Sequence, residues 1–453
     1  MSLLLPFRAL HARRKTERSC RWTPAELKER QREGVAAIRG WAYHNSPFYR
    51  RFHRGLEGRP LNDLPVLTKA ELMDGFDELV TDRMVRLQDV EEHLSVPSSG
   101  RLYRDRYVAL ATSGSTGRRG VFLFDQHEWV TALTSISRPM MWAGLRPSPF
   151  RRVRTAMVAS TSPSHYSARV GQSLATRVMP TLRLDASLPL EFMVRRLNVW
   201  RPEVLMAYPS VLRPLAEEQI GGRLRIPLRI VAASAEVLPP ETRQLVRQAW
   251  QVGVWDTYGA TEYAPIAAEC DYGRKHLFEG GAVIEIVDER GRPVPPGITG
   301  DRVLLTVFNR RTQPLIRYEI TDRIRLSGRE CECGRPFRVV EQIEGRVEET
   351  LYFDGRHGKV PLHPNAFHAV LEGVRCTGWQ VVQEDEGLIV KLTGVRETAV
   401  CETVQEAMGR MLADLGAQVE NIWVRLVPEL QRGASGKAPL IASRVGQELR
   451  TAG

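Results

Sequence analysis

The chain has 453 residues, 43% of them hydrophobic, and a net charge of +11, so it can bury large cores and is expected to form two or more domains. No apolar run reaches the roughly 18 residues that a membrane helix needs, and Pro6 interrupts the N-terminal leucines, so we expect a cytoplasmic protein with no membrane partner. The positive charge suits an anionic partner, but the arginines are scattered rather than clustered, which argues against nucleic acid.

The first half of the chain is predicted to be helical and then α/β. Residues 24–57 have a helical, amphipathic pattern with a turn and then aromatic residues at 44–50. From about residue 105 to 265, strand and helix patterns alternate, which indicates an α/β fold of mixed or parallel sheets flanked by helices. The elements expected there are the buried strands Val153–Ser160, Val204–Ala207 and Ile230–Ser234 and the helices Leu188–Trp200 and Pro240–Val252.

The second half is predicted to be richer in strands. Residues 281–326 show short alternating strands with Gly-Arg-Pro and Pro-Pro-Gly turns, which indicates a β-subdomain. From near Gly345 the sequence combines hairpin and helix signals and ends in a helix at Ala399–Leu415, the pattern of a small α+β unit.

A loop rich in glycine and hydroxyl groups lies between two predicted strands, Tyr107–Ala111 and Val121–Phe124. Its two glycines allow backbone N–H groups to turn toward one point, and its hydroxyls add donors, a composition suited to phosphate. An ordinary Ser/Gly linker is the alternative, and the Gly-Lys-Ser/Thr ending of kinase-type loops is absent. The candidate residues are Thr112, Ser113, Gly114, Ser115, Thr116 and Gly117.

A second polar loop, Asp256–Glu262, follows the predicted strand Val252–Trp255. Its glycine allows a sharp turn that lets the neighbouring side chains converge. A tyrosine can stack on a base, a threonine can bind a phosphoryl oxygen and a glutamate can ligate Mg²⁺, although an ordinary surface loop has the same composition. The candidates are Tyr258, Gly259, Ala260, Thr261 and Glu262.

The six cysteines in so long a chain argue against a disulfide framework and leave metal binding or simple burial. Cys331-Glu-Cys-Gly is one close pair, and Cys270 with His276 is a second pair after Glu262. Together they predict a zinc site, which would be structural because four ligands leave no open position. Its ligands would be Cys270, His276, Cys331 and Cys333, while Cys20, Cys376 and Cys401 look like ordinary residues.

Five motifs follow one another along the chain: Thr112–Gly117, Tyr258–Glu262, Arg317–Asp322, Glu344–Glu348 and Gly433–Lys437. In this order they resemble the motifs of the adenylate-forming enzymes, and in particular of the phenylacetate-coenzyme A ligase branch with its capsule-locus relatives. The likeness spans essentially the whole chain, and the segments Ser46–Arg50 and Leu64–Leu72 share it. Relatives in this branch look similar at the four zinc positions, and some carry a metal there.

The resemblance implies a role for each matching residue. Lys437 matches the catalytic lysine that reaches the substrate carboxylate and the α-phosphate, and only seven of the 64 basic residues are lysine, so a casual solvated lysine is the weaker alternative. Asp322 matches the acid that holds the ribose hydroxyls, with a turn or cap aspartate as the alternative. Arg346 is expected near ribose or phosphate, and the segment with Ala235 and Glu236 resembles the one that lines adenine.

The resemblance also implies the reaction and the domain plan. Residues 1–343 would form a large N-terminal domain, and residues 344–453 a small mobile domain that rotates about a hinge at Glu348. The expected reaction is activation of a carboxylic acid with ATP and Mg²⁺, in which Thr261 and Glu262 take part, followed by transfer to coenzyme A. One alternative keeps the activation step but transfers the acid to an acyl carrier protein or to an amine. The other alternative, from a different class of protein, is a basic zinc-containing nucleic-acid binder.

The acid itself is not specified by the motifs. The segment Trp129–Met141 and Tyr208 are expected to line its pocket, and their aromatic side chains hint at an aryl acid. A homodimer is left open.

Overall fold

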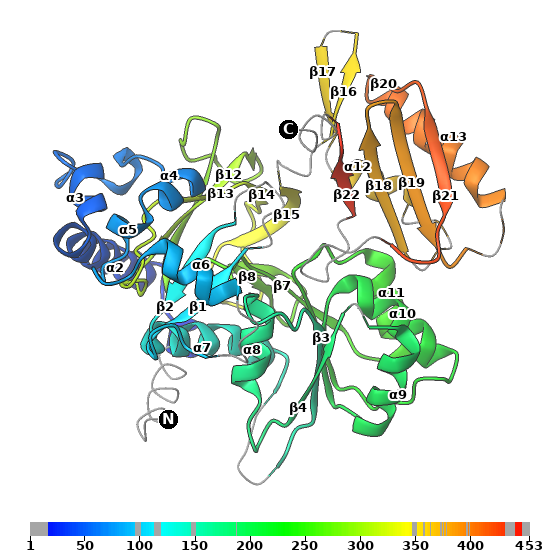
Figure 1. Cartoon of the computed structure of the whole chain (residues 1–453), viewed down its shortest axis with the longest axis horizontal. Helices are drawn as coiled ribbons and strands as arrows, with labels where there is room; N and C mark the ends of the chain where they lie inside the picture. Colours follow the sequence, from blue (N-terminus) through cyan, green and yellow to red (C-terminus); the bar gives the residue numbers. More distant parts are fainter. Residues whose placement is uncertain are drawn as a thin grey trace.

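The computed structural model describes the chain outside residues 1–16, 96–100, 113–118, 146–150, 347–350, 431–439 and 446–453 and positions 187, 357, 363, 372–373, 375, 377, 396 and 398. Figure 1 shows a larger lobe that contains the elements up to β15 (Val339–Arg346) and a smaller lobe from β16 (Leu351–Gly355) onward. No helix within the described ranges has both the length and the hydrophobicity to cross a membrane.

A group of helices precedes the first strand and covers one end of the larger lobe (Figure 1). The longest helix, α2 (Pro24–Asn45), begins with a capping box between Thr23 and Glu26 and ends one residue before Ser46. Ser46 is extended, with φ −117° and ψ 113°, because Pro47 follows it. The predicted turn therefore lies at Ser46, and the aromatic residues after it form α3. The other members are α3 (Pro47–Phe52), η1 (Leu61–Asp63), α4 (Lys69–Asp74), α5 (Phe76–Leu79) and α6 (Leu87–Ser95).

The centre of the larger lobe is a ten-stranded mixed sheet. Five neighbouring strands are parallel, in the order β4 (Thr181–Asp185), β3 (Thr155–Ala159), β5 (Val204–Ala207), β6 (Ile230–Ser234) and β7 (Val254–Tyr258). The sheet continues with antiparallel pairs through β8 (Ala267–Glu269), β9 (Lys275–Leu277), β15, β14 (Asp322–Leu326) and β11 (Thr299–Gly300).

Helices flank the parallel half of this sheet, which confirms the predicted α/β class. The predicted strand Val252–Trp255 is displaced, however, because β7 continues to Tyr258, whose backbone pairs with Ala267 of β8. The first part of the second motif is therefore strand rather than loop. In Figure 1 one group of helices lies on each side of the parallel strands: α7 (Gln126–Trp142) and α8 (Tyr166–Leu174) on one side, and α9 (Leu190–Trp200), α10 (Pro209–Ile220) and α11 (Pro240–Trp250) on the other.

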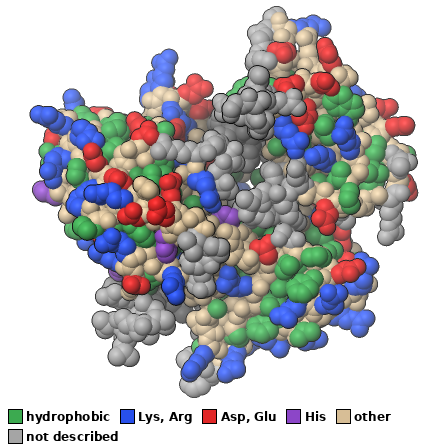
Figure 2. Space-filling model, viewed as in Figure 1, with side chains coloured by type: hydrophobic (Ala, Val, Ile, Leu, Met, Phe, Trp, Pro, Cys, Tyr) green, Lys and Arg blue, Asp and Glu red, His purple; other side chains and the backbone are tan. Residues whose placement is uncertain are grey.

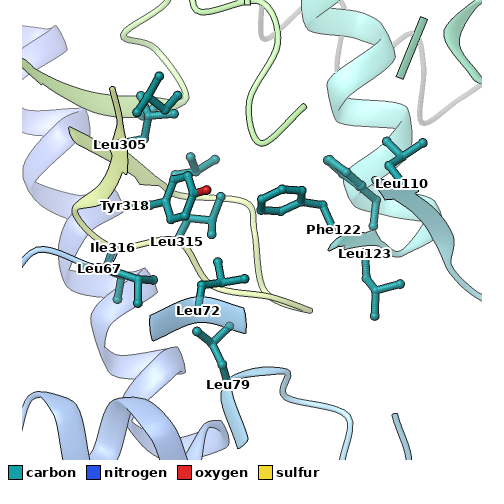
Figure 3. Packing of buried hydrophobic residues seen from close by; sticks show 14 of the residues in the cluster. Leu67, Leu72, Leu79, Leu110, Phe122, Leu123, Leu305, Leu315, Ile316 and Tyr318 are labelled. Carbon is teal, nitrogen blue, oxygen red and sulfur yellow. The ribbon is translucent and has the colours of Figure 1, made fainter. Parts of the chain in front are cut away.

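Two smaller sheets complete the described part of the larger lobe. The two strands predicted on either side of the first loop are present, and β1 (Val108–Ala111) pairs antiparallel with β2 (Val121–Phe124). The predicted β-subdomain is only partly separate, since β10 (Ala282–Val287), β12 (Arg302–Val307) and β13 (Tyr318–Ile320) form their own sheet while β11 and β14 join the large one. The rings of Phe122 and Tyr318 pack edge to face, with 6.0 Å between their centroids, in the core that these sheets share with the N-terminal helices (Figure 3).

The smaller lobe has a hydrophobic core of its own, in which Phe353, Phe367, Trp379 and Leu412 are buried. The long helix predicted at Ala399–Leu415 is present as α13 (Ala399–Asp414). Basic and acidic side chains are interspersed on the face of the molecule shown in Figure 2. The remaining elements are β17 (Gly358–Leu362), α12 (Pro364–Leu371), β18 (Gly378–Glu384), β19 (Gly387–Thr393), β20 (Ala417–Gln418), β21 (Ile422–Leu426) and β22 (Ile441–Ser443).

Candidate active site

A cavity of about 310 Å³ reaches the carboxyl ends of β5, β6 and β7, the edge at which open α/β sheets bind ligands. Three segments singled out from the sequence line it: Thr112 at the start of the first loop, Ala235 after β6, and residues 259–262 after β7. The structure thus brings together motifs that lie far apart in the sequence.

Thr112 closes the base of the first loop. Its backbone N–H donates to the carbonyl of Gly120 at 2.9 Å, and its hydroxyl accepts from the N–H of Gly120 at 2.8 Å. The two ends of the loop are therefore held together at the cavity. The other candidates in this loop, Ser113, Gly114, Ser115, Thr116 and Gly117, lie outside the described residues.

The segment after β6 presents its backbone to the cavity and uses its acidic side chain elsewhere. Ala235 has φ +71°, a left-handed conformation that is uncommon for a non-glycine residue and costs it free energy. The carboxylate of Glu236 accepts hydrogen bonds from the backbone N–H of Ser210 at 2.9 Å and from its hydroxyl at 3.1 Å. Because Ser210 lies in the first turn of α10, Glu236 anchors this segment to the positive end of a helix.

The second and third motifs meet directly. The hydroxyl of Tyr258 donates a short hydrogen bond to the carboxylate of Asp322, which is the first residue of β14. Arg346 lies opposite Asp322 in the β14–β15 register, so the fourth motif reaches the same place through its backbone. One side-chain hydrogen bond and one strand pairing therefore bring Tyr258, Asp322 and the backbone of Arg346 together, beside the lining residues Thr257 and Gly259.

Glu262 is buried at the cavity, with 8% of its surface exposed, and lies next to Thr261 in the lining. Its Oε1 accepts a hydrogen bond from the hydroxyl of Tyr318 at 3.2 Å. A carboxylate oriented in this way offers the hard oxygen ligand that Mg²⁺ prefers.

Sequence reasoning missed Arg310, whose side chain is 2% exposed. Its guanidinium lies 3.7 Å from the centroid of the Phe124 ring, at the end of β2. Burial lowers its pKa, and the nearby groups Glu128, Tyr166 and Glu262 oppose this shift. Arg310 is thus a fixed positive charge beside the cavity, and nothing in a sequence rich in arginine marks it out.

Two further predicted residues fall outside the described part of the chain. The catalytic candidate Lys437 belongs to residues 431–439, and the hinge candidate Glu348 to residues 347–350. Their roles stay predictions.

The wall of the cavity agrees in part with the predicted acid pocket. Tyr208 and four residues of the predicted segment line it, namely Ile136, Ser137, Met140 and Met141. Trp129 does not line it, because its ring packs against Phe124 and Tyr166, each at 5.6 Å, and its Nε1–H donates to Ser173 at 3.0 Å. The aromatic end of the segment therefore belongs to the core.

The predicted metal ligands Cys270, His276, Cys331 and Cys333 form one cluster, with all donor atoms within 4.8 Å of one another. The sulfurs of Cys270 and Cys331 are 3.7 Å apart, close to the roughly 3.8 Å between two sulfurs on a tetrahedral zinc. His276 donates its Nδ1–H to the carbonyl of Phe337 at 2.9 Å, which leaves Nε2 facing Cys333 at 3.2 Å. Burial lowers the pKa of His276 and keeps the imidazole in the neutral form that binds metals.

Helix α7 lies between this cluster and the cavity. Met140 and Met141 line the cavity, whereas the ring of Trp142 packs edge to face against the ring of His276, with 6.3 Å between their centroids. The guanidinium of Arg335 covers the same indole at 4.3 Å. The cluster therefore supports the helix that forms one wall of the candidate active site.

Comparisons with known proteins identify the class. The AMP-binding enzyme family matches residues 71–304, more than half of the chain, and the chain belongs to this family. Phenylacetate-coenzyme A ligase of Thermus thermophilus is 25% identical over 376 residues, which cover 80% of each protein. Protein CapK of Staphylococcus aureus is 21% identical and covers 66% of this chain and 63% of that protein. The resemblance read from the five motifs is thereby confirmed.

A solved structure supports the fold. The crystal structure of 2-hydroxyisobutyryl-CoA ligase in the postadenylation state superposes with a TM-score of 0.70 at 21% identity and covers 93% of this chain and 90% of that one. This structural likeness concerns the fold, and the family match together with the T. thermophilus relative identifies the chain as an AMP-forming ligase of the adenylate-forming class.

Proposed function

We propose that the chain activates a carboxylic acid with ATP and transfers the acyl group to the thiol of coenzyme A. A carboxylate oxygen attacks the α-phosphorus of ATP, and the bond to pyrophosphate breaks. The thiol sulfur then attacks the acyl carbon, loses its proton, and AMP leaves. The observation that carries this proposal is the single cavity at which Thr112, Ala235, Thr261 and Glu262 meet beside an apolar wall.

The nucleotide would bind along the edge of the sheet. The backbone around Ala235 would line adenine, and Asp322, held in place by Tyr258, would bind the ribose hydroxyls. Arg346 would approach the ribose or a phosphate from the neighbouring strand. The hydroxyls and N–H groups of residues 112–117 would bind the phosphates.

The charge that develops at the α-phosphate would be met from two sides. Glu262 would hold Mg²⁺ from the larger lobe, next to the hydroxyl of Thr261. Lys437 would bring its ammonium group from the C-terminal domain to the carboxylate and the α-phosphate. We place the domain boundary between residues 343 and 344 and the hinge at Glu348. The separate hydrophobic core after residue 350 supports this division.

The Cys/His cluster would hold one structural zinc ion. Its three thiolate ligands and the neutral imidazole of His276 suit zinc, and four protein ligands leave no position for chemistry. The contribution of the metal would be to fix the loops that carry Cys270 and Cys331, and through Trp142 the position of α7.

For the acid we propose an aryl or similar apolar compound. The T. thermophilus relative is named for phenylacetate. The cavity has an apolar wall from α7 and two tyrosines, Tyr166 and Tyr208, in its lining.

The acceptor is tested by AMP release. Coenzyme A carries a diphosphate and a 3′-phosphate, which suit a chain of net charge +11. We therefore expect purified protein with its acid, ATP and Mg²⁺ to release AMP rapidly when free coenzyme A is added. A phosphopantetheinylated carrier protein is the comparison arm. Rapid release with the carrier and none with free coenzyme A would replace the proposal by carrier loading.

A further inference from the structure

One face of the central sheet forms the floor of the cavity behind the nucleotide edge. The strands β3, β5 and β6 are parallel neighbours, and their register places Met157 beside Met206 and Met206 beside Ala232. The alternate residues Ala156 and Leu205 face the other side and pack in the core beneath α9–α11. The floor is therefore a row of two thioether side chains and one methyl group across three strands.

The walls of this region are also aliphatic. Helix α7 contributes Ile136, Met140 and Met141, and α8 contributes Val170 and Leu174. With Met179, five of the chain's 11 methionines line the cavity. Methionine is unbranched and polarizable, so a surface made of it adapts to ligands of different shape, whether these are chains or rings.

The polar groups near the floor already bond to one another. The hydroxyl of Tyr208 accepts from the N–H of Ser160 at 3.0 Å and lies 3.3 Å from the hydroxyl of Ser167. His165 Nδ1 and the hydroxyl of Ser160 are 2.6 Å apart. Among the described lining residues, Glu262 is the one carboxylate, and the lining includes no lysine or arginine. A second charged group that reaches this floor would lose its water without gaining a charged partner, since Arg310 is not among the lining residues.

A glycine in α8 leaves the space that the Met157 side chain occupies. A Cβ atom at Gly171 would lie 2.7 Å from the sulfur of Met157, closer than real Cβ contacts. Gly171 is buried, and its helix neighbours Val170 and Leu174 face the cavity. The thioether can therefore lie against the helix backbone instead of projecting into the space in front of it.

We propose that the site selects monocarboxylic acids with an uncharged, apolar body and discriminates among them by length, with Met157 seated against Gly171 as the residue that sets the limit. This rests on the proposed acid-activating function. If the proposal holds, Met157 and Gly171 determine which acids the cavity accepts. An acid then needs no aromatic ring to be activated.

The first test compares acids that differ in one property, using ATP–pyrophosphate exchange. Straight-chain acids from butanoate to octanoate should gain about fourfold in kcat/KM for each added methylene until the limit is reached. The diacids adipate and suberate, matched in length to hexanoate and octanoate, should fall about 100-fold or more below them. Diacids that match the monoacids would overturn the inference while leaving the acid-activating function intact, whereas no exchange with any acid would reject that function itself.

The second test uses Gly171→Ala, whose methyl group would lie 2.7 Å from the Met157 sulfur, and we expect the sulfur to move toward the cavity. The longest accepted acid should lose about tenfold in kcat/KM, the shortest should stay within about twofold, and the KM for ATP should not change. Gly40→Ala in α2 is the matched control, because a Cβ there meets no atom within 4 Å.

A double variant distinguishes the length limit from damage to the fold. Met157→Ala alone should extend the range to longer acids, and in the Gly171→Ala background it should restore the acid lost, so that the two changes are not additive. Equal loss for every acid in Gly171→Ala, without rescue by Met157→Ala, would overturn the assignment.

Discussion

Lys437→Ala is expected to lower acid-dependent adenylate formation by about 100-fold or more. The variant removes a positive charge that we place at the α-phosphate in the transition state, and the loss of one preorganised charge at a reacting centre has this magnitude. ATP binding should be retained, because most of the residues that we propose to contact the nucleotide belong to the larger lobe. The rate is measured as ATP–pyrophosphate exchange, and ATP binding by calorimetry.

The matched control is Lys391→Ala, on β19 of the same lobe, which removes an equal charge away from the motifs. This variant should exchange at the wild-type rate. Undiminished exchange in Lys437→Ala would refute the catalytic role, and equal losses in both variants would reduce it to a general effect of charge.

Cys331→Ser is expected to remove about one zinc ion per chain and to lower the melting temperature by about 5 °C or more. The free energy of binding a closed metal site adds to the stability of the fold, so its loss appears first in unfolding. Specific activity at low temperature should fall much less, because no step of the reaction uses the metal. Elemental analysis and thermal unfolding give the two measurements.

Cys401→Ser in α13 serves as the control, since this thiol is partly exposed and lies outside the cluster. It should keep both the metal content and the melting temperature. Wild-type protein purified gently and found without metal would contradict the zinc proposal, as would a Cys331→Ser variant that melts with the wild type.

The strands that could be predicted are those whose sequence allows few alternatives. Val204–Ala207 and Ile230–Ser234 are short apolar runs between helices and were predicted to the residue as β5 and β6. The strand predicted at Val252–Trp255 ended too early, because the last residues of β7, Asp256, Thr257 and Tyr258, are polar. The backbone of this part of β7 is nevertheless paired with β6 on one side and β8 on the other. Pairing with neighbours decided the end of this strand, and the neighbours are not visible in a local pattern.

The motifs of the candidate site could be predicted, but its contacts could not. The glycine loops and the spacing of the motifs identified Thr112, Thr261 and Glu262, which the fold brings to one cavity. The bonds from Tyr258 to Asp322 and from Tyr318 to Glu262 depend on the order of strands in the sheet. Local sequence carries no record of that order.

The residues of the cavity floor could not be predicted from the sequence for a different reason. A parallel sheet covered by helices on both sides has apolar residues on both faces, so its strands lack an alternating pattern. Nothing in the sequence therefore distinguishes Met157 and Met206, which line the cavity, from Ala156 and Leu205, which pack beneath the opposite helices. Similarly, Cys270 and Cys331 meet because β9 pairs with β15, where His276 lies opposite Val339.

ATP–pyrophosphate exchange by the wild-type protein, without any thiol, tests the central claim most directly. Formation of an acyl-adenylate is reversible, so labelled pyrophosphate should enter ATP only when a suitable acid and Mg²⁺ are present. A panel of aryl, hydroxyaryl and straight-chain acids should contain at least one that raises exchange well above the acid-free rate. Exchange that stays at the acid-free rate for every acid would contradict the account.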